Sequence, residues 1–208
     1  MSHSFVPDPR NAGVLIYLNG SLVPRSQATV SVLDSGFVMG DGVWESFRVR
    51  SGRVGFVDAH LDRLFEGAAA LMIDIGMSRD EILAAIRQTL AANGMTDDVH
   101  LRLMITRGIR STPYQDPRVV IGGPTVVIVP EYKRPTPRTR PLTLFTVHVR
   151  RGRADVQDPG FNNHAKLNCI TACIQATQAG ADEGLMLDPQ GFVAVSYTHL
   201  TLPTTYTV

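Results

Sequence analysis

The chain has 208 residues, of which 44% are hydrophobic and 19% are charged, an ordinary globular composition with room for one large domain or two small ones. Twenty basic residues against 19 acidic ones leave a formal net charge of +1, which excludes a strong non-specific attraction to nucleic acid or to an anionic membrane. No run approaches the roughly 20 apolar residues of a membrane span, and the N-terminus lacks the apolar core of a signal peptide, so we expect a cytoplasmic protein.

The first predicted element is a β-hairpin. Two apolar runs, at residues 14–18 and 21–23, flank Asn19-Gly20, a pair typical of a two-residue hairpin turn. A glycine-rich turn at residues 36–42 then leads into residues 43–49, where apolar and polar residues alternate as in a half-buried strand. The chain therefore opens with β structure.

Two amphipathic helices are predicted next. Between Asp58 and Ile73, apolar residues recur at helical spacing and form one stripe that can be buried. Ser78 and Glu81 form a capping box at the start of the second helix, and Gly94 ends it. We expect this second helix to serve packing.

Two further strands are predicted at residues 99–106 and 125–129. The loop between them contains Thr112-Pro113-Tyr114 and two adjacent glycines, and loops of this length in compact domains are often functional. Residues 131–140 are rich in proline and arginine and suit an extended linker. The first predicted domain is therefore residues 1–130.

The second predicted domain covers residues 141–194. A β-like run at its start is followed by a helix at residues 165–179 and by two short strands, at residues 184–187 and 191–194. Residues 195–208 change character, because they are rich in threonine, carry no charged residue and show neither a helical pattern nor a clean strand pattern.

Lysine chemistry has two candidates, because Lys133 and Lys166 are the only lysines among the 20 basic residues. Lys166 stands at the start of a helix whose other residues are mostly apolar or small. One interpretation is a solvated lysine on the first turn of a helix. The other is a partly desolvated amine, neutral and nucleophilic enough to form a Schiff base.

Three arginines are candidate anion-binding residues. Arg63 offers a rigid bidentate fork for a phosphate group, although its pattern, taken alone, favours a surface arginine. Arg107, next to Gly108 at the end of a strand, is a better candidate for a substrate carboxylate than Arg102, which we expect to be solvated. The six histidines are too scattered to propose a metal site.

Taken together and in this order, several motifs resemble the fold-type IV, or class IV, pyridoxal-phosphate enzymes. That family includes the branched-chain and D-amino-acid aminotransferases, the (R)-selective amine transaminases and aminodeoxychorismate lyase. The match spans nearly all of residues 14–194. The motifs are Tyr17-Leu18-Asn19-Gly20, Asp34-Ser35-Gly36-Phe37, Gly40-Asp41-Gly42-Val43-Trp44-Glu45, His60-Leu61-Asp62-Arg63-Leu64, Thr106-Arg107-Gly108, Lys166-Leu167-Asn168 and Ala179-Gly180-Ala181-Asp182-Glu183.

The resemblance implies a D-amino-acid aminotransferase-like fold of the α/β class, with an α+β N-terminal domain and an α/β C-terminal domain. It implies pyridoxal 5'-phosphate as cofactor and a homodimer. Lys166 is the lysine expected to form the internal aldimine, and Arg63 the residue expected to hold the cofactor phosphate. Trp44, Arg107 and Tyr114 are expected to face the substrate.

The function implied is transamination of an amino acid or amine with a 2-oxo acid. A lyase related to aminodeoxychorismate lyase shares the fold and the lysine, so it stays an alternative. After Ala194 the family usually continues with a glutamate that pairs with the pyridine nitrogen, whereas this chain has Val195 and the threonine-rich stretch. We therefore expect an incomplete C-terminal domain and a non-native tail at residues 195–208, which leaves a non-catalytic fragment as a further alternative.

Overall fold

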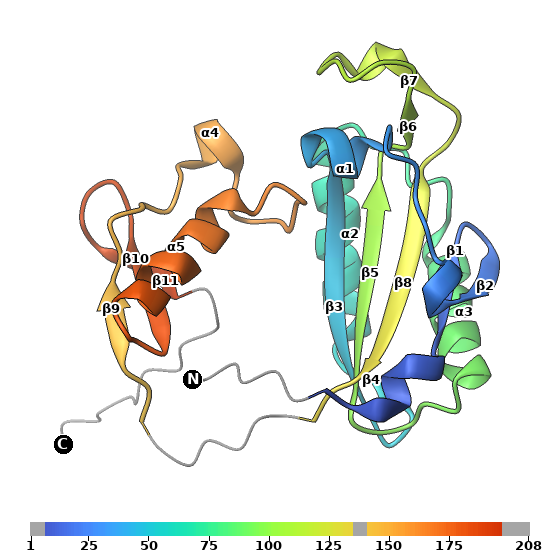
Figure 1. Cartoon of the computed structure of the whole chain (residues 1–208). Coiled ribbons are helices and arrows are strands. Elements are labelled where there is room, and N and C mark those ends of the chain that lie inside the picture. The colour runs from blue at the N-terminus through green and yellow to red at the C-terminus, as the bar shows by residue number, and fades with distance from the viewer. Residues whose placement is uncertain (1–6, 135–140, 197–208) are drawn as a thin grey trace. The chain divides into compact units, whose positions relative to one another are not determined.

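The computed structural model of the chain describes residues 7–134 and 141–196 (Figure 1). The described residues form two compact units. The N-terminal unit consists of residues 7–134 together with residues 161–165, and the C-terminal unit of residues 141–160 together with residues 166–196. The two units are therefore not separated by a single linker. Residues 161–165, which lie beyond the predicted linker, belong to the N-terminal unit.

The N-terminal unit is built on a six-stranded sheet in the order β2-β1-β8-β5-β3-β4, in which every neighbouring pair is antiparallel. Figure 1 shows its two long helices, α2 and α3, on one face of this sheet. A two-stranded ribbon, β6-β7, lies within the long loop between β5 and β8. The strands are β1 (Leu15–Leu18), β2 (Ser21–Pro24), β3 (Gly42–Arg50), β4 (Arg53–Val54), β5 (Val99–Thr106), β6 (Ile109–Arg110), β7 (Val120–Ile121) and β8 (Thr125–Tyr132).

The helices of this unit are α1 (Ser35–Met39), α2 (Val57–Ala70) and α3 (Arg79–Ala92), with 3₁₀ turns at Pro9–Gly13, Arg25–Gln27 and Pro117–Val119. The predicted capping box is present, since the Ser78 hydroxyl accepts from the Glu81 amide and the Glu81 carboxylate accepts from the Ser78 amide. Asp34 caps α1 by accepting from the amide of Gly36.

The main core lies between the sheet and the two long helices. Alternate residues of each central strand face the helices, as the pleat requires, and meet the apolar stripes of α2 and α3. This packing explains why the helical periodicity was visible in the sequence. The buried residues at this contact include Val43, Phe47, Leu61, Leu64, Ile82, Ile86, Leu101, Leu103, Ile105 and Ile128.

The C-terminal unit has a three-stranded sheet in the order β11-β10-β9, with β10 parallel to β9 and antiparallel to β11. Its elements are β9 (Leu144–Thr146), α4 (Ala154–Gln157), α5 (Leu167–Gln178), β10 (Glu183–Leu187) and β11 (Val193–Ser196). Its small core contains Val147, Ala172, Ala176 and Met186.

Two predicted boundaries differ from the observed elements. Strand β8 runs through Tyr132, two residues into the predicted linker, and residues 135–140 lie outside the described residues. Strand β11 continues through Ser196, because Val195 and Ser196 pair with Met186 and Leu185 of β10. Two residues of the expected tail thus belong to the sheet, and residues 197–208 lie outside the described part of the chain.

No helix among the described residues is long and apolar enough to cross a membrane.

Candidate functional site

A buried carboxylate on β3 organises the first group of polar side chains. Glu45 is 1% exposed, and its oxygens accept from Arg63 Nε at 2.5 Å and from Arg63 Nη2 at 2.7 Å. His60 Nδ1 lies 2.8 Å from Glu45 Oε2, and the Asn162 amide donates to Oε1 at 3.3 Å. His60 and Arg63 stand one turn apart on α2, so both reach the same residue of the sheet beneath it.

The ionisation of Glu45 follows from these contacts. Burial alone would raise the pKa of the Glu45 carboxyl, but the hydrogen bonds from Arg63 and His60 outweigh it and hold that pKa below its ordinary value. The carboxylate is therefore charged at neutral pH and fixes the Arg63 guanidinium through two parallel bonds. Arg63 is 39% exposed, and its Nη1 has no acceptor among the described residues. One edge of the guanidinium thus remains open to an anion.

Residues 161–165, which we call the strap, add an extra segment to the edge of β3. The amide of Trp44 donates to Asn162 O at 3.0 Å, and the amide of His164 donates to Gly42 O at 2.9 Å. Val43 and Asn163 form the corresponding antiparallel bridge. The strap is fastened by paired backbone bonds, in the way that an edge strand would be.

The side chains of the strap contact the same group of residues. Phe161 packs on Gly67 of α2, where an added Cβ would lie 3.0 Å from Phe161 Cβ. Asn162 reaches Glu45, and Ala165 lies against Gly40, whose φ of +67° favours glycine. Lys166 follows Ala165 directly, so its Cα lies about 3.8 Å from that of Ala165.

Lys166 itself is the N-cap residue of α5 in the C-terminal unit, and its carbonyl accepts the amide of Ile170. The helix begins one residue later than Lys166 and two residues later than predicted. Lys166 is half-buried, and Cys169 on the same turn accepts from Arg151 Nη1 at 3.7 Å.

Trp44 points to the sheet face opposite the helices. Its indole Nε1 donates to Asn163 O at 2.9 Å, and the Arg102 guanidinium carbon lies 4.1 Å from the centre of its ring. Burial lowers the pKa of Arg102, which still remains charged at neutral pH. We expected Arg102 to be solvated, whereas it is a partly desolvated cation beside an aromatic ring. The sequence alone does not show the antiparallel register of β3 and β5. This register places Arg102 opposite Ser46, two residues from Trp44.

Arg107 makes more protein contacts than a dedicated substrate ligand needs. Its Nε and Nη2 donate to the two oxygens of Asp41, and its remaining bonds run from Nη2 to Leu71 O and from Nη1 to Met72 O. Nε, both hydrogens of Nη2 and one of Nη1 are therefore engaged, out of five donors in a guanidinium. Arg107 ties the end of α2 to the glycine turn, and a substrate contact stays a prediction.

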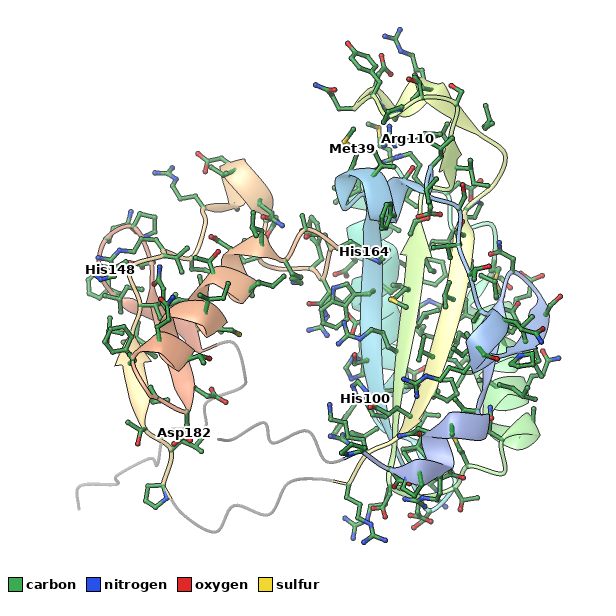
Figure 2. All side chains as sticks on the ribbon, viewed as in Figure 1. Met39, His100, Arg110, His148, His164 and Asp182 are labelled. Atoms are coloured by element: carbon green, nitrogen blue, oxygen red, sulfur yellow. The ribbon has the colours of Figure 1, made fainter. Side chains whose placement is uncertain are left out.

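Sequence reasoning missed Arg110, which is 1% exposed. Its Nη2 donates to Asp41 at 2.6 Å, and its Nη1 donates to the carbonyls of Tyr114 and Asp116 at 2.6 and 3.2 Å. The loop that carries the predicted substrate residue Tyr114 is therefore fastened from within. Tyr114 is itself 54% exposed, and Figure 2 labels Arg110 at the base of this loop.

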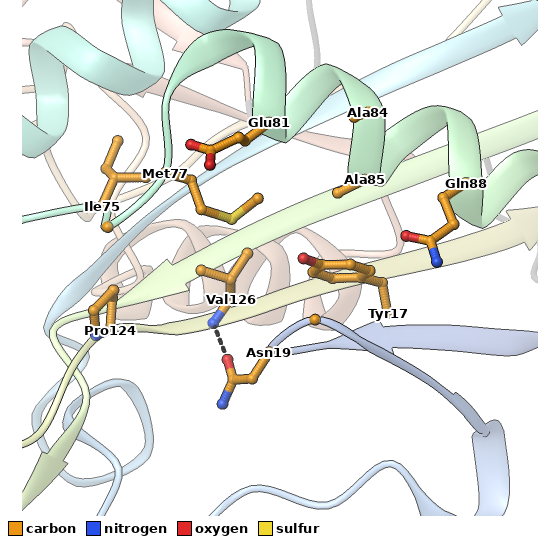
Figure 3. A pocket seen from close by; sticks show the side chains of 12 residues that line it. Tyr17, Asn19, Ile75, Met77, Glu81, Ala84, Ala85, Gln88, Pro124 and Val126 are labelled. Atoms are coloured by element: carbon orange, nitrogen blue, oxygen red, sulfur yellow. Dashed lines mark hydrogen bonds between the residues drawn. The ribbon is translucent and has the colours of Figure 1, made fainter.

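An open groove of about 520 Å³ lies elsewhere in the N-terminal unit, between α3 and the start of the sheet. Figure 3 shows Tyr17, Met77 and Gln88 around it, with Asn19 held by its bond to the amide of Val126. None of the predicted site residues lines this groove.

His100 is a second titratable group on the sheet face that carries Arg102. Burial lowers its pKa from 6.5 to about 4, and the positive charges of Arg48, Lys133 and Arg102 act in the same direction. The Glu131 carboxylate, 3.9 Å from Nδ1, is too distant to accept a hydrogen bond from the ring. His100 is therefore neutral in the folded protein at pH 7.

This depressed pKa predicts a loss of stability in acid. Between pH 6.5 and about 4 the unfolded chain binds a proton that the folded protein refuses, so the free energy of unfolding falls as the pH falls through this window. Between pH 6.5 and about 4, the free energy of unfolding of His100→Gln should fall by about 1–2 kcal/mol less than that of the unsubstituted chain, allowing for solvent screening. Urea denaturation of both proteins at several pH values measures the difference. Equal losses in the two proteins would contradict the assignment.

Comparison with known proteins decides the family. The model of the family described as amino-transferase class IV matches residues 42–198. The chain belongs to the class IV aminotransferase family. Pyridoxal 5'-phosphate is the cofactor of class IV aminotransferases.

Curated relatives within this family carry branched-chain aminotransferase names. The chain is 39% identical over 178 residues to a putative branched-chain-amino-acid aminotransferase of Methanocaldococcus jannaschii, with 86% of this chain and 61% of that protein covered. It is 38% identical over 190 residues to branched-chain-amino-acid aminotransferase-like protein 2 of Arabidopsis thaliana, with 91% of this chain and 34% of that protein covered. The chain thus spans between about a third and three-fifths of the length of these relatives.

Solved class IV structures share the fold. The branched-chain aminotransferase of Thermoproteus uzoniensis, solved with norvaline, matches with a TM-score of 0.76 at 26% identity, covering 88% of this chain and 63% of that one. A T.th. branched-chain amino acid aminotransferase, complexed with N-(5'-phosphopyridoxyl)-L-glutamate, matches with a TM-score of 0.80 at 25% identity, covering 89% and 62%. These matches confirm the predicted fold class, with the C-terminal domain of that fold represented in part.

Proposed function

We propose that this chain binds pyridoxal 5'-phosphate and serves the transamination of an amino acid or amine with a 2-oxo acid. Lys166 is the amine that attaches covalently to the cofactor aldehyde, and Arg63 holds the cofactor phosphate. The observation that carries this proposal is the strap, because the five residues that precede Lys166 are fastened to β3 and to Glu45, the residue that orients Arg63.

The residues present fit the cofactor. A phosphate site needs a charged hydrogen-bond donor that is held in place and still accessible. Glu45 holds Nε and Nη2 of Arg63, and the Nη1 edge of the guanidinium remains open. A lysine that attaches to an aldehyde must be held where its amine can reach it, and Lys166 stands half-buried at the start of α5, directly after the strap.

Bound pyridoxal 5'-phosphate supplies an electron sink for the substrate carbon that carries the amino group. The chain supplies positioning and proton transfer. The Nζ atom of Lys166 would hold the cofactor and, when free, would serve as the base that moves a proton at the substrate carbon.

The substrate-facing residues we propose are Trp44, Arg107 and Tyr114, joined by Arg102. Trp44 offers an apolar wall, and the Arg102 guanidinium stacked on it is a cation with no carboxylate hydrogen-bonded to it in the described structure. Such a cation suits the carboxylate of an amino acid or a 2-oxo acid. The names of the curated relatives favour a branched-chain amino acid as the donor or, from the D-alanine aminotransferase of Staphylococcus haemolyticus at 26% identity over 120 residues, a D-amino acid.

Covalent trapping tests the proposal. Purified protein is incubated with pyridoxal 5'-phosphate and reduced with borohydride, and the labelled peptides are identified by mass spectrometry. We expect the label on Lys166 in the unsubstituted chain and in Lys133→Ala, the control at the other lysine, and its loss from that position in Lys166→Ala.

A second arm tests Arg63. Arg63→Gln, whose amide can still donate to Glu45, should raise the pyridoxal 5'-phosphate concentration needed for half-maximal labelling by much more than the concentration of pyridoxal, which lacks the phosphate. Equal labelling of Lys133 and Lys166 would sink the assignment of Lys166. Transfer of the amino group to 2-oxoglutarate by the loaded protein separates a transaminase from a lyase.

Two further proposals are a homodimer, which the family resemblance implies, and a cytoplasmic location, which we expected from the composition and the N-terminal sequence. Sedimentation velocity of the purified chain tests the first.

A further inference from the structure

The imidazole ring of His164 is packed closely against two glycines, Gly36 and Gly42. A Cβ added at Gly36 would lie 3.1 Å from His164 Nδ1, and one added at Gly42 would lie 3.1 Å from His164 Cδ2. The added atoms would meet still nearer neighbours, Thr106 Cγ2 at 2.5 Å for Gly36 and Ile105 O at 2.7 Å for Gly42, so the ring is one of several groups packed closely against the two glycines. The imidazole is thereby seated between the start of α1 and the start of β3 (Figure 2).

The backbone of the same residue completes the attachment. Its amide donates to Gly42 O at 2.9 Å, so His164 is bound to the glycine turn by its main chain and packed against it by its ring. On the other side of His164, the strap is held by Trp44 and Glu45 through Asn162 and Asn163. His164 is thus bound to β3 through its backbone two positions before Lys166.

The imidazole is neutral in this seat. Burial lowers the pKa of His164, and Arg102 acts in the same direction, against the opposing effects of the Val43 backbone, Asp34 and Asp41. Its Nε2 is buried without a hydrogen-bond partner among the described residues. A protonated ring would leave a buried N–H donor unsatisfied, so the seat selects the neutral ring.

We propose that His164 is a positioning residue for Lys166. Its ring, packed between Gly36 and Gly42, holds the strap against β3 and thereby fixes the point at which the chain departs from β3, two residues before Lys166. This inference rests on the proposed role of Lys166. It assigns no chemistry to His164, which acts only through the backbone that it holds.

The test compares His164→Ala, His164→Asn and the exposed control His148→Asn, in the whole chain at pH 8. The rate of borohydride-trapped labelling of Lys166 by pyridoxal 5'-phosphate should fall about tenfold to a hundredfold in His164→Ala, because displacement of a reacting group by about 1 Å has effects of this size. His164→Asn restores part of the side-chain volume between Gly36 and Gly42 and should recover part of the rate. His148→Asn should match the unsubstituted chain, because His148 is exposed and lies outside the strap.

Amide hydrogen exchange provides a readout that is independent of the cofactor. The amide of residue 164, bound to Gly42 O, should exchange faster in His164→Ala while the amides of β5 remain protected, which distinguishes local release from unfolding. If the unsubstituted chain is not labelled at Lys166, the proposed function fails, and the exchange of residue 164 still decides the inference. Unchanged exchange in His164→Ala, or unchanged labelling of a Lys166 that is labelled in the parent, would overturn it.

Discussion

Replacement of Arg63 by methionine should destabilise the N-terminal unit by about 3 kcal/mol even without cofactor. The reason lies in Glu45, which is 1% exposed and would keep only His60 and Asn162 as partners. Removing one member of a buried ion pair leaves an uncompensated charge, which costs more than the pair contributes. Urea denaturation at neutral pH measures the change in the free energy of unfolding.

Two further variants separate this effect from a general loss of charge. The double variant Glu45→Met with Arg63→Met should be more stable than Arg63→Met alone, because the stranded carboxylate is gone. Arg79→Met removes a pair of similar type, with Asp62, whose side chains are 42% and 58% exposed, and should change stability by less than about 1 kcal/mol. Equal losses of unfolding free energy in Arg63→Met and Arg79→Met would show that Arg63 is not needed to compensate the buried charge of Glu45.

Replacement of Arg110 by methionine should cost about 2–3 kcal/mol and release the loop around Tyr114. Arg110 makes charge-assisted bonds to Asp41 and to two loop carbonyls from a fully buried position, and methionine replaces none of them. Asp41 keeps Arg107, so the largest structural effect should appear in the loop. Hydrogen exchange of residues 111–119 and urea denaturation together measure both parts.

Arg118 offers a control in the same loop. Its side chain is 89% exposed and pairs with Asp116 at the surface, so Arg118→Met should stay within about 1 kcal/mol and leave exchange in the loop unchanged. We attribute the effect on the loop to the buried contacts of Arg110 and not to the loss of a positive charge. Equal loosening of the loop in Arg110→Met and Arg118→Met would contradict this.

The elements predicted well are those with a long repeating signal. The stripe of α2 and the capping box of α3 were visible because an apolar face must recur every three or four residues to reach the sheet. Short elements such as α1, β4 and β6 carry too few residues for a period to appear. The order of the strands was also beyond local pattern, because pairing depends on residues far apart in sequence.

The candidate site was predictable in its residue types and less so in its contacts. Arg63 and Lys166 were chosen by their resemblance to a family, and no local pattern indicates that Glu45, 18 positions away, orients Arg63. Arg107 was chosen for its place at a strand end, and its partners Asp41, Leu71 and Met72 become visible only when the turn and the end of α2 meet in space.

The strap has a consequence for the order in which the protein can fold. The edge of β3 at Val43 is completed by Asn163, 120 positions later, so during synthesis this edge cannot be completed until the strap has been made. Until then the backbone groups of Gly42 and Trp44 that bind the strap face water or another chain, and an open strand edge is a place where two chains can pair. Because the entropy cost of closing a loop grows slowly with its length, the 120 positions between Val43 and Asn163 cost little more than a shorter connection would.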